Sequence, residues 1–179
     1  MSPEEIAALL RGRIPHVELG NFPTPVEIAQ PLSENLGADV RVKRDDLSST
    51  QYSGNKVRKL EFVFADAKAR GARTVLTFGG VGSHHAVATT VHARRAGLGC
   101  EVVVVDQPLT PDVRKSLLLG AHFGAHLHYR PRYVQAAAAV PGLLRELKRR
   151  DGVAPYFLVP GASSPTGCVG YALAALELR

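Results

Sequence analysis

The chain has 179 residues, the length of one ordinary domain. Of these, 45% are hydrophobic and 21% are charged, which predicts a packed core and excludes a disordered protein. The formal net charge is +6, but the basic residues are scattered and aromatic residues make up only 6%, so we expect no nucleic-acid partner. There is neither an apolar run of the ~18 residues that cross a membrane nor a cationic leader with an apolar stretch, so we expect a soluble cytoplasmic protein with no membrane partner.

The first predicted elements are short. Residues 2–5 form a capping box with proline at the first helical position, which predicts the start of a helix. A second short helix is expected over residues 24–36, bent or broken at Pro31 and ended by Gly37. The alternating residues 40–43 predict a strand.

A longer helix is expected over residues 56–70, whose apolar residues are spaced for one face. Asn55 would be its N-cap, which places three cations in the first turn. A helix N-terminus carries about half a positive charge, so each cation there is disfavoured by about 0.3–1 kcal/mol. This departure marks the segment as a candidate site, and its three cations are Lys56, Arg58 and Lys59.

From residue 74 onwards, strands alternate with helices. Short runs rich in β-branched residues are typical of strands buried on both faces of a parallel sheet. This alternation predicts an α/β fold with an open, doubly wound, mostly parallel sheet and flanking helices. Strands are expected at residues 74–78, 101–105, 126–129 and 156–159, and helices at 84–95, 112–119, 133–150 and from 166 onwards.

A glycine-rich turn joins the strand at 74–78 to the next helix; it reads Gly79-Gly80-Val81-Gly82-Ser83. Such a turn exposes backbone N–H groups to an anion. It matches neither a P-loop nor G-x-G-x-x-G, so a carboxylate fits as well as a phosphate. A tight turn with Ser83 as N-cap is the plainer alternative. A serine hydrolase is not expected, because no G-x-S-x-G elbow is present and Ser83 cannot pair with an adjacent histidine.

Lys56 is the candidate nucleophile. It follows Gly54 at the positive end of the predicted helix, which disfavours the charged amine, and a neutral lysine amine is the form that attacks carbonyl carbons. A solvated lysine on a flexible stem is the alternative. We expect no metal site, because neither the two cysteines nor the seven histidines show the spacing of metal ligands.

A specific resemblance is carried by residues 43–86, which read KRDDLSSTQYSGNKVRKLEFVFADAKARGARTVLTFGGVGSHHA. The order and spacing of Lys-Arg-acid-Asp, S-G-N-K-x-R-K-L-E-F and G-G-x-x-S resemble the 1-aminocyclopropane-1-carboxylate deaminase and D-cysteine desulfhydrase family. Residues 23–25 resemble the family's entry segment, and residues 161–171 its Gly/Ser loop and following helix. The resemblance covers nearly the whole chain and implies a tryptophan-synthase-β-like fold.

The resemblance also implies a cofactor, an activity and a set of site residues. The cofactor is pyridoxal 5'-phosphate, held covalently by Lys56. The activity is deamination or β-elimination on a small amino acid, such as 1-aminocyclopropane-1-carboxylate or D-cysteine, by a full-length form that is a homo-oligomer. Lys56 and Ser83 are the implied catalytic residues. Asn55 and His84 join Lys56 at the cofactor, and the substrate carboxylate is bound by Gly80, Gly82, Ser83, His84 and His85.

Two places depart from the family pattern. His84 stands where the family usually has asparagine, and residues 48–52 differ from the family's Gly/Ala-rich version of that stretch.

The family is much longer than this chain, so we expect a C-terminally incomplete, N-terminal half. Residues 1–68 would be the first part of the large cofactor-binding domain, 69–158 the small α/β domain, and 159–179 the return into the large domain. Two alternatives remain open. One is a non-catalytic or degenerate fragment of this fold, and the other is a small nucleotide-binding α/β domain.

Overall fold

A four-stranded parallel sheet organises the larger part of the fold in the computed structural model, which describes residues 1–178. Its spatial order is β5-β4-β3-β6, and β3 pairs with β4 from Thr74 opposite Gly99 to Gly80 opposite Val105. Three parallel pairings of this kind require crossovers, which the intervening helices supply. The strands are β3 (Thr74–Gly80), β4 (Gly99–Val105), β5 (Ala125–Tyr129) and β6 (Tyr156–Phe157).

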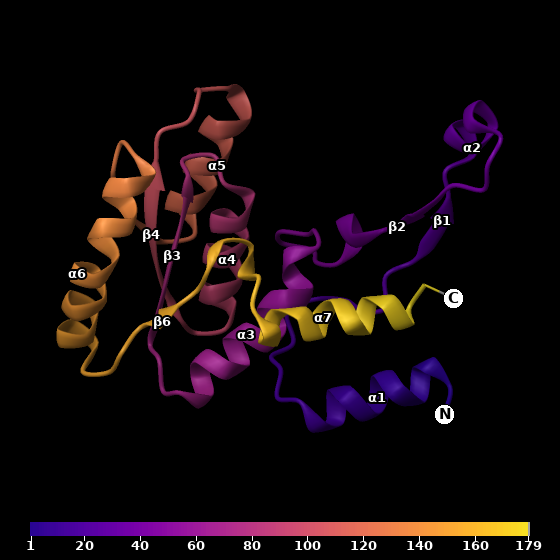
Figure 1. Ribbon diagram of the computed structural model, residues 1–179, viewed down its shortest axis with the longest axis horizontal. Coiled ribbons are helices and arrows are strands. Elements are labelled where there is room, and N and C mark those ends of the chain that lie inside the picture. The colour runs from indigo at the N-terminus through magenta and orange to yellow at the C-terminus, as the bar shows by residue number, and fades with distance from the viewer. Residues whose placement is uncertain (179) are drawn as a thin grey trace.

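Helices cover both faces of this sheet (Figure 1). α4 (His84–Arg95) and α5 (Pro111–His122) lie against one face, and α6 (Tyr133–Asp151) lies against the other. Along β4, Val102 and Val104 belong to the core on the α4 side, whereas Val103 and Val105 pack with α6. The doubly wound α/β fold is therefore confirmed, because the near-continuous apolar strands are buried on both faces.

The rest of the chain lies beside the sheet. α3 (Lys56–Ala69) packs along α7 (Pro165–Leu176), and α1 (Pro3–Arg13) lies next to α7 (Figure 1). Gly170 of α7 faces the backbone of α3, because a Cβ added there would lie 2.1 Å from the carbonyl oxygen of Arg58. Glycine thus allows the two helices to approach more closely than any side chain would permit.

The expected helix over residues 24–36 is wrong in its first half. β1 (Val26–Ile28) is a strand that pairs antiparallel with β2 (Arg41–Lys43), and only α2 (Gln30–Leu36) is helical. Pro31 lies in the first turn of α2, where its missing N–H is no loss. Gly37 ends α2 with a φ of 61°, as expected. The strand expected at 156–159 is also shorter, because β6 is followed by a turn of 3-10 helix at Pro160–Ala162.

A buried ion cluster joins three segments at the first turn of α3. The side chain of Arg58 is only 1% exposed, and its guanidinium lies 2.8 Å from Asp45 Oδ1 and 2.8 Å from Glu177 Oε1. It also stacks on the ring of Phe22, 4.3 Å from the centroid. Lys43 adds a second cation, 2.7 Å from Glu177 Oε2. The cluster therefore ties the 3-10 turn Asp45–Leu47 and the end of α7 to α3.

Replacing Gly170 by alanine is expected to lower the free energy of unfolding by about 1–3 kcal/mol or more, because a methyl group would collide with rigid backbone rather than with a movable side chain. Chemical denaturation monitored by circular dichroism measures the change.

Gly142→Ala is the matched control. Gly142 also lies inside a helix, α6, but an added Cβ would meet no atom within 4 Å. Alanine is the better helix former by about 0.5–1 kcal/mol, so this variant should be neutral or slightly stabilised. Equal effects of the two substitutions would contradict the close packing of α3 and α7.

Candidate active site

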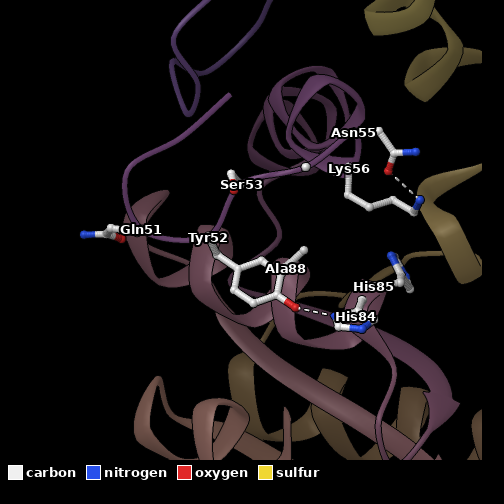
Figure 2. Close-up of a pocket in the computed structure, with 9 residues that line it drawn as sticks. Gln51, Tyr52, Ser53, Asn55, Lys56, His84, His85 and Ala88 are labelled. Carbon is white, nitrogen blue, oxygen red and sulfur yellow. Dashed lines mark hydrogen bonds between the residues drawn. The ribbon is translucent and has the colours of Figure 1, made fainter. Parts of the chain in front are cut away.

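A cleft of about 500 Å³ opens where the N-termini of α3 and α4 come together (Figure 2). The segment that leads into α3 turns sharply at Gly54, whose φ is 117°, a value that glycine adopts readily and other residues rarely do. The Gly54 N–H donates to the carbonyl of Asp45 and to Ser48 Oγ, which fixes the turn. The lining residues are Gln51, Tyr52, Ser53, Gly54, Asn55, Lys56, His84, His85 and Ala88.

Lys56 differs from the other two cations of the first turn. Arg58 is neutralised by carboxylates, and Lys59 Nζ donates to Gly161 O at 3.2 Å and Ser163 Oγ at 3.1 Å. Among the described residues, Lys56 Nζ donates only to the amide oxygen Oδ1 of Asn55, at 2.8 Å. Burial, followed by the charge of Lys59, lowers the pKa of Lys56. Within residues 1–178 its amine has no carboxylate partner, so nothing there offsets the cost of burying its charge.

Asn55 occupies the N-cap position of α3, as expected, but its side chain makes no capping hydrogen bond. Its amide oxygen accepts from Lys56 instead. The side chain that could have stabilised the helix end therefore orients the amine.

His85 forms a buried, neutral part of the cleft wall. It is 7% exposed, and its Nε2 lies 3.1 Å from Thr77 Oγ1. Because the Thr77 hydroxyl donates to Leu158 O, at 2.8 Å, it must accept from His85 Nε2–H. Burial, and then the charges of Lys56 and Lys59, lower the pKa of His85 to about 4. The ring is therefore uncharged at neutral pH.

His84 and Tyr52 meet across the cleft (Figure 2). The Tyr52 hydroxyl lies 2.8 Å from Nδ1 of the exposed His84, and the Tyr52 carbonyl lies 2.8 Å from Nε2 of the buried His92. Burial raises the pKa of Tyr52. Two histidines of α4 thus hold one residue of the segment that precedes Lys56.

The glycine turn lies apart from the cleft lining. Ser83 is the N-cap of α4, as expected, with its Oγ accepting from the Ala86 N–H at 3.3 Å. The Gly82 N–H donates to Gln107 Oε1 at 3.2 Å, and the Ser83 N–H donates to Gly80 O at 2.9 Å. The structure therefore places Lys56, Asn55, His84 and His85 in one cleft, whereas Ser83, Gly80 and Gly82 are not among its lining residues.

Two residues near these groups, Gln107 and Tyr52, are not among the site residues predicted from the sequence. Gln107 lies two residues after the end of β4, at the carboxyl end of the sheet where ligands of open α/β sheets bind, and that position is the available signal. Tyr52 lies in residues 48–52, which differ from the family's Gly/Ala-rich version of that stretch. Its contacts with α4 depend on tertiary packing that no local pattern reveals.

Neither a metal cluster nor a membrane span is found in the part of the chain that the structure describes. No group of three or more His, Cys, Asp or Glu residues among residues 1–178 is arranged to hold a metal ion. His128 pairs with Glu101 at 2.7 Å instead. Within the same residues, no helix combines the length and apolar character needed to cross a bilayer.

Comparison with known proteins adds an independent line of evidence. A family model described as "Pyridoxal-phosphate dependent enzyme" matches residues 17–179. A Pyrococcus abyssi protein provisionally named as a 1-aminocyclopropane-1-carboxylate deaminase is 35% identical over 97% of this chain and 52% of its own length. The D-cysteine desulfhydrase of Salmonella paratyphi B is 34% identical over 93% of this chain and 52% of its own length.

A solved structure agrees with these sequence relatives. The crystal structure of an ACC deaminase homologue superposes with a TM-score of 0.84 at 36% identity, covering 99% of this chain and 54% of that one. The chain therefore spans about half the length of the curated relatives it matches.

The buried neutral His85 makes the stability of the chain depend on pH. The unfolded chain takes up this proton near pH 6.5, but the folded chain only near pH 4, so the unfolded state binds more protons between these values. The free energy of unfolding should therefore fall as the pH falls from about 6.5 to about 4, by on the order of 1–3 kcal/mol for this residue. Denaturant titrations across this range should show a smaller fall in His85→Gln.

His122→Gln, an exposed histidine of α5, is the control and should keep the full pH dependence. The buried His92 also has a lowered pKa, caused mainly by burial, so part of the dependence should survive in His85→Gln. An unchanged dependence in His85→Gln would show that folding does not lower the pKa of His85.

Proposed function

The chain belongs to the family of pyridoxal-phosphate dependent enzymes, and from this premise we propose that it carries the cofactor-binding lysine, Lys56, of a deaminase or β-elimination lyase acting on small amino acids. The observation that carries the proposal is the amine of Lys56, which has a lowered pKa and faces a cleft without a carboxylate partner in residues 1–178. The relatives named as a deaminase and as a desulfhydrase support both reactions equally.

The residues of the cleft fit an aldehyde cofactor. The amine of Lys56 needs only to give up one amide hydrogen bond, to Asn55 Oδ1, before it can attack a carbonyl carbon. His85 is neutral and adds no further positive charge beside it. Bound there, pyridoxal 5'-phosphate would supply an aldehyde that bonds to amines and a ring that accepts the electron pair of a broken bond at the substrate α-carbon.

The residues of this chain would divide the remaining work. Lys56 Nζ would hold the cofactor and, once released from it, accept and return a proton, for which a lowered pKa is suited. Asn55 would orient that amine through its Oδ1. His84 and His85 would contact the cofactor and the substrate from the N-terminus of α4, where the helix dipole favours anionic groups.

The glycine turn can take part only after two of its present hydrogen bonds break. Gly80, Gly82 and Ser83 would bind the substrate carboxylate only after Gln107 leaves the Gly82 N–H. Ser83 would act in catalysis only if its hydroxyl can leave the capping bond with Ala86. These roles, the three-part domain division, the homo-oligomer and the cytoplasmic location stay predictions.

The nucleotide-binding alternative has less support. A phosphate site at a glycine turn needs several free backbone N–H groups. In this turn the N–H groups of Val81, Gly82 and Ser83 already have partners.

Covalent trapping tests the proposal. The purified chain is incubated with pyridoxal 5'-phosphate and reduced with borohydride, and the modified residue is located by peptide mass spectrometry. We expect the adduct on Lys56, because its amine lies in the cleft and its pKa is lowered. Lys56→Arg keeps the positive charge but lacks the primary amine, so this variant should lose the adduct.

Lys115→Arg, an exposed position on α5, is the matched control and should keep the adduct at the wild-type level. An adduct spread evenly over exposed lysines, or one that persists in Lys56→Arg, would remove Lys56 from the proposal. Because the chain spans about half the length of its relatives, trapping is a more direct test than turnover.

A further inference from the structure

We propose that Tyr52 is a positioning residue whose hydroxyl donates to Nδ1 of His84 and thereby fixes that ring in the Nε2–H form, ready to donate to an acceptor bound in the cleft. Which molecule supplies that acceptor rests on the proposed function, but the state of the ring does not. The inference starts from the 2.8 Å contact between the Tyr52 hydroxyl and His84 Nδ1, two atoms of residues that both line the cleft (Figure 2).

The direction of the hydrogen bond follows from the available partners. In a neutral imidazole one nitrogen donates and the other accepts. If Nδ1 of His84 carried the hydrogen, the Tyr52 hydroxyl would have to accept and to donate to water, since residues 1–178 offer it no second partner. A phenol hydroxyl is the better donor, and an unprotonated imidazole nitrogen the better acceptor, so the opposite direction is favoured. With the hydrogen on Nε2, the hydroxyl donates to Nδ1, and only the Nε2–H, on an exposed ring, awaits a ligand or water.

The position of His84 suits an acceptor ligand. His84 is the first residue of α4, where the partial positive charge of the helix end favours an anionic acceptor for the Nε2–H.

Tyr52 can act in this way because its backbone is held independently of its side chain. Its carbonyl lies 2.8 Å from Nε2 of His92, a ring that is 0% exposed. A carbonyl only accepts, so His92 must donate from Nε2, and its buried Nδ1 has no partner among the described residues. The same segment is closed by Ser48, whose Oγ contacts both the N–H and the carbonyl of Gly54.

Tyr52 has two roles, one carried by its backbone carbonyl and the other by its side-chain hydroxyl. The backbone anchor at His92 sets where the residue lies, and the hydroxyl sets which nitrogen of His84 carries the hydrogen. Removing the hydroxyl alone should leave the segment in place and free the imidazole to exchange between its two neutral forms. A purely structural tyrosine would not change the state of His84.

Nitrogen NMR of the ligand-free chain tests the inference. In ¹⁵N-histidine-labelled protein, long-range ¹H–¹⁵N spectra at mildly alkaline pH distinguish a protonated from an unprotonated ring nitrogen, and His84→Gln assigns the signal. We expect His84 of the wild type to show an unprotonated Nδ1 and a protonated Nε2. Tyr52→Phe should shift both nitrogens toward an average of the two forms.

Tyr129→Phe is the matched control. Tyr129 is exposed, and its hydroxyl donates to Asp106 Oδ1 at 2.8 Å, outside the residues that line the cleft. This variant should leave the His84 signals unchanged. A hydrogen on Nδ1 of His84 in the wild type, or identical His84 signals in wild type and Tyr52→Phe, would overturn the inference.

A second measurement separates this inference from the proposed function. If His84 donates from Nε2 to the bound cofactor, Tyr52→Phe should weaken pyridoxal 5'-phosphate binding about fivefold, the effect of one lost hydrogen bond, with the adduct still on Lys56. A wild-type chain that forms no adduct contradicts the proposed function, whereas the NMR result decides the role of Tyr52 in either case.

Discussion

The buried guanidinium of Arg58 is the interaction on which the arrangement of the site depends. It lies between Asp45, just before the cleft segment, and Glu177, just after α7. Removing one partner of such a buried pair leaves an uncompensated charge and typically costs about 3–5 kcal/mol. Because residues two apart on a helix point in nearly opposite directions, Arg58 faces this cluster while Lys56 faces the cleft. Three cations in one first turn are therefore compatible with stability, since Arg58 is neutralised by carboxylates and Lys59 donates to Gly161 O and Ser163 Oγ. Within residues 1–178, Lys56 is left with the amide oxygen of Asn55.

The cleft combines a reactive amine with neutral hydrogen-bonding groups. Two helix N-termini meet there, so their dipoles favour anionic ligands and disfavour a protonated amine. His85 is kept uncharged by burial and by its lysine neighbours, and Asn55 supplies an amide oxygen rather than a carboxylate. The residues of the cleft thus supply no negative charge of their own, and a bound ligand can supply it. This agrees with a family whose cofactor carries a phosphate.

The sheet and its helices could be predicted from the sequence because local patterns determine them: runs of valine in β4, capping residues at α1 and α4, and the apolar face of α3. Lys56 could be found because its position conflicts with the helix dipole. Contacts between distant segments could not be found in this way. The strand β1 depends on pairing with β2, and the placement of Tyr52 depends on His92, 40 residues later. The division of the site between a cleft and a separate glycine turn follows from such packing.

The partner that completes the Arg58 cluster has a consequence for how the protein is made. Glu177 lies 119 residues beyond Arg58 in the chain. At a synthesis rate of about 5–20 residues per second, the nascent helix α3 waits on the order of ten seconds before its second carboxylate exists. Until then Asp45 is the one carboxylate of the cluster that can neutralise Arg58, and the surface of α3 that later packs against Gly170 is exposed to solvent. During this interval the surface of α3 that packs on α7 stays open to misfolding and to chaperone capture, until α7 docks.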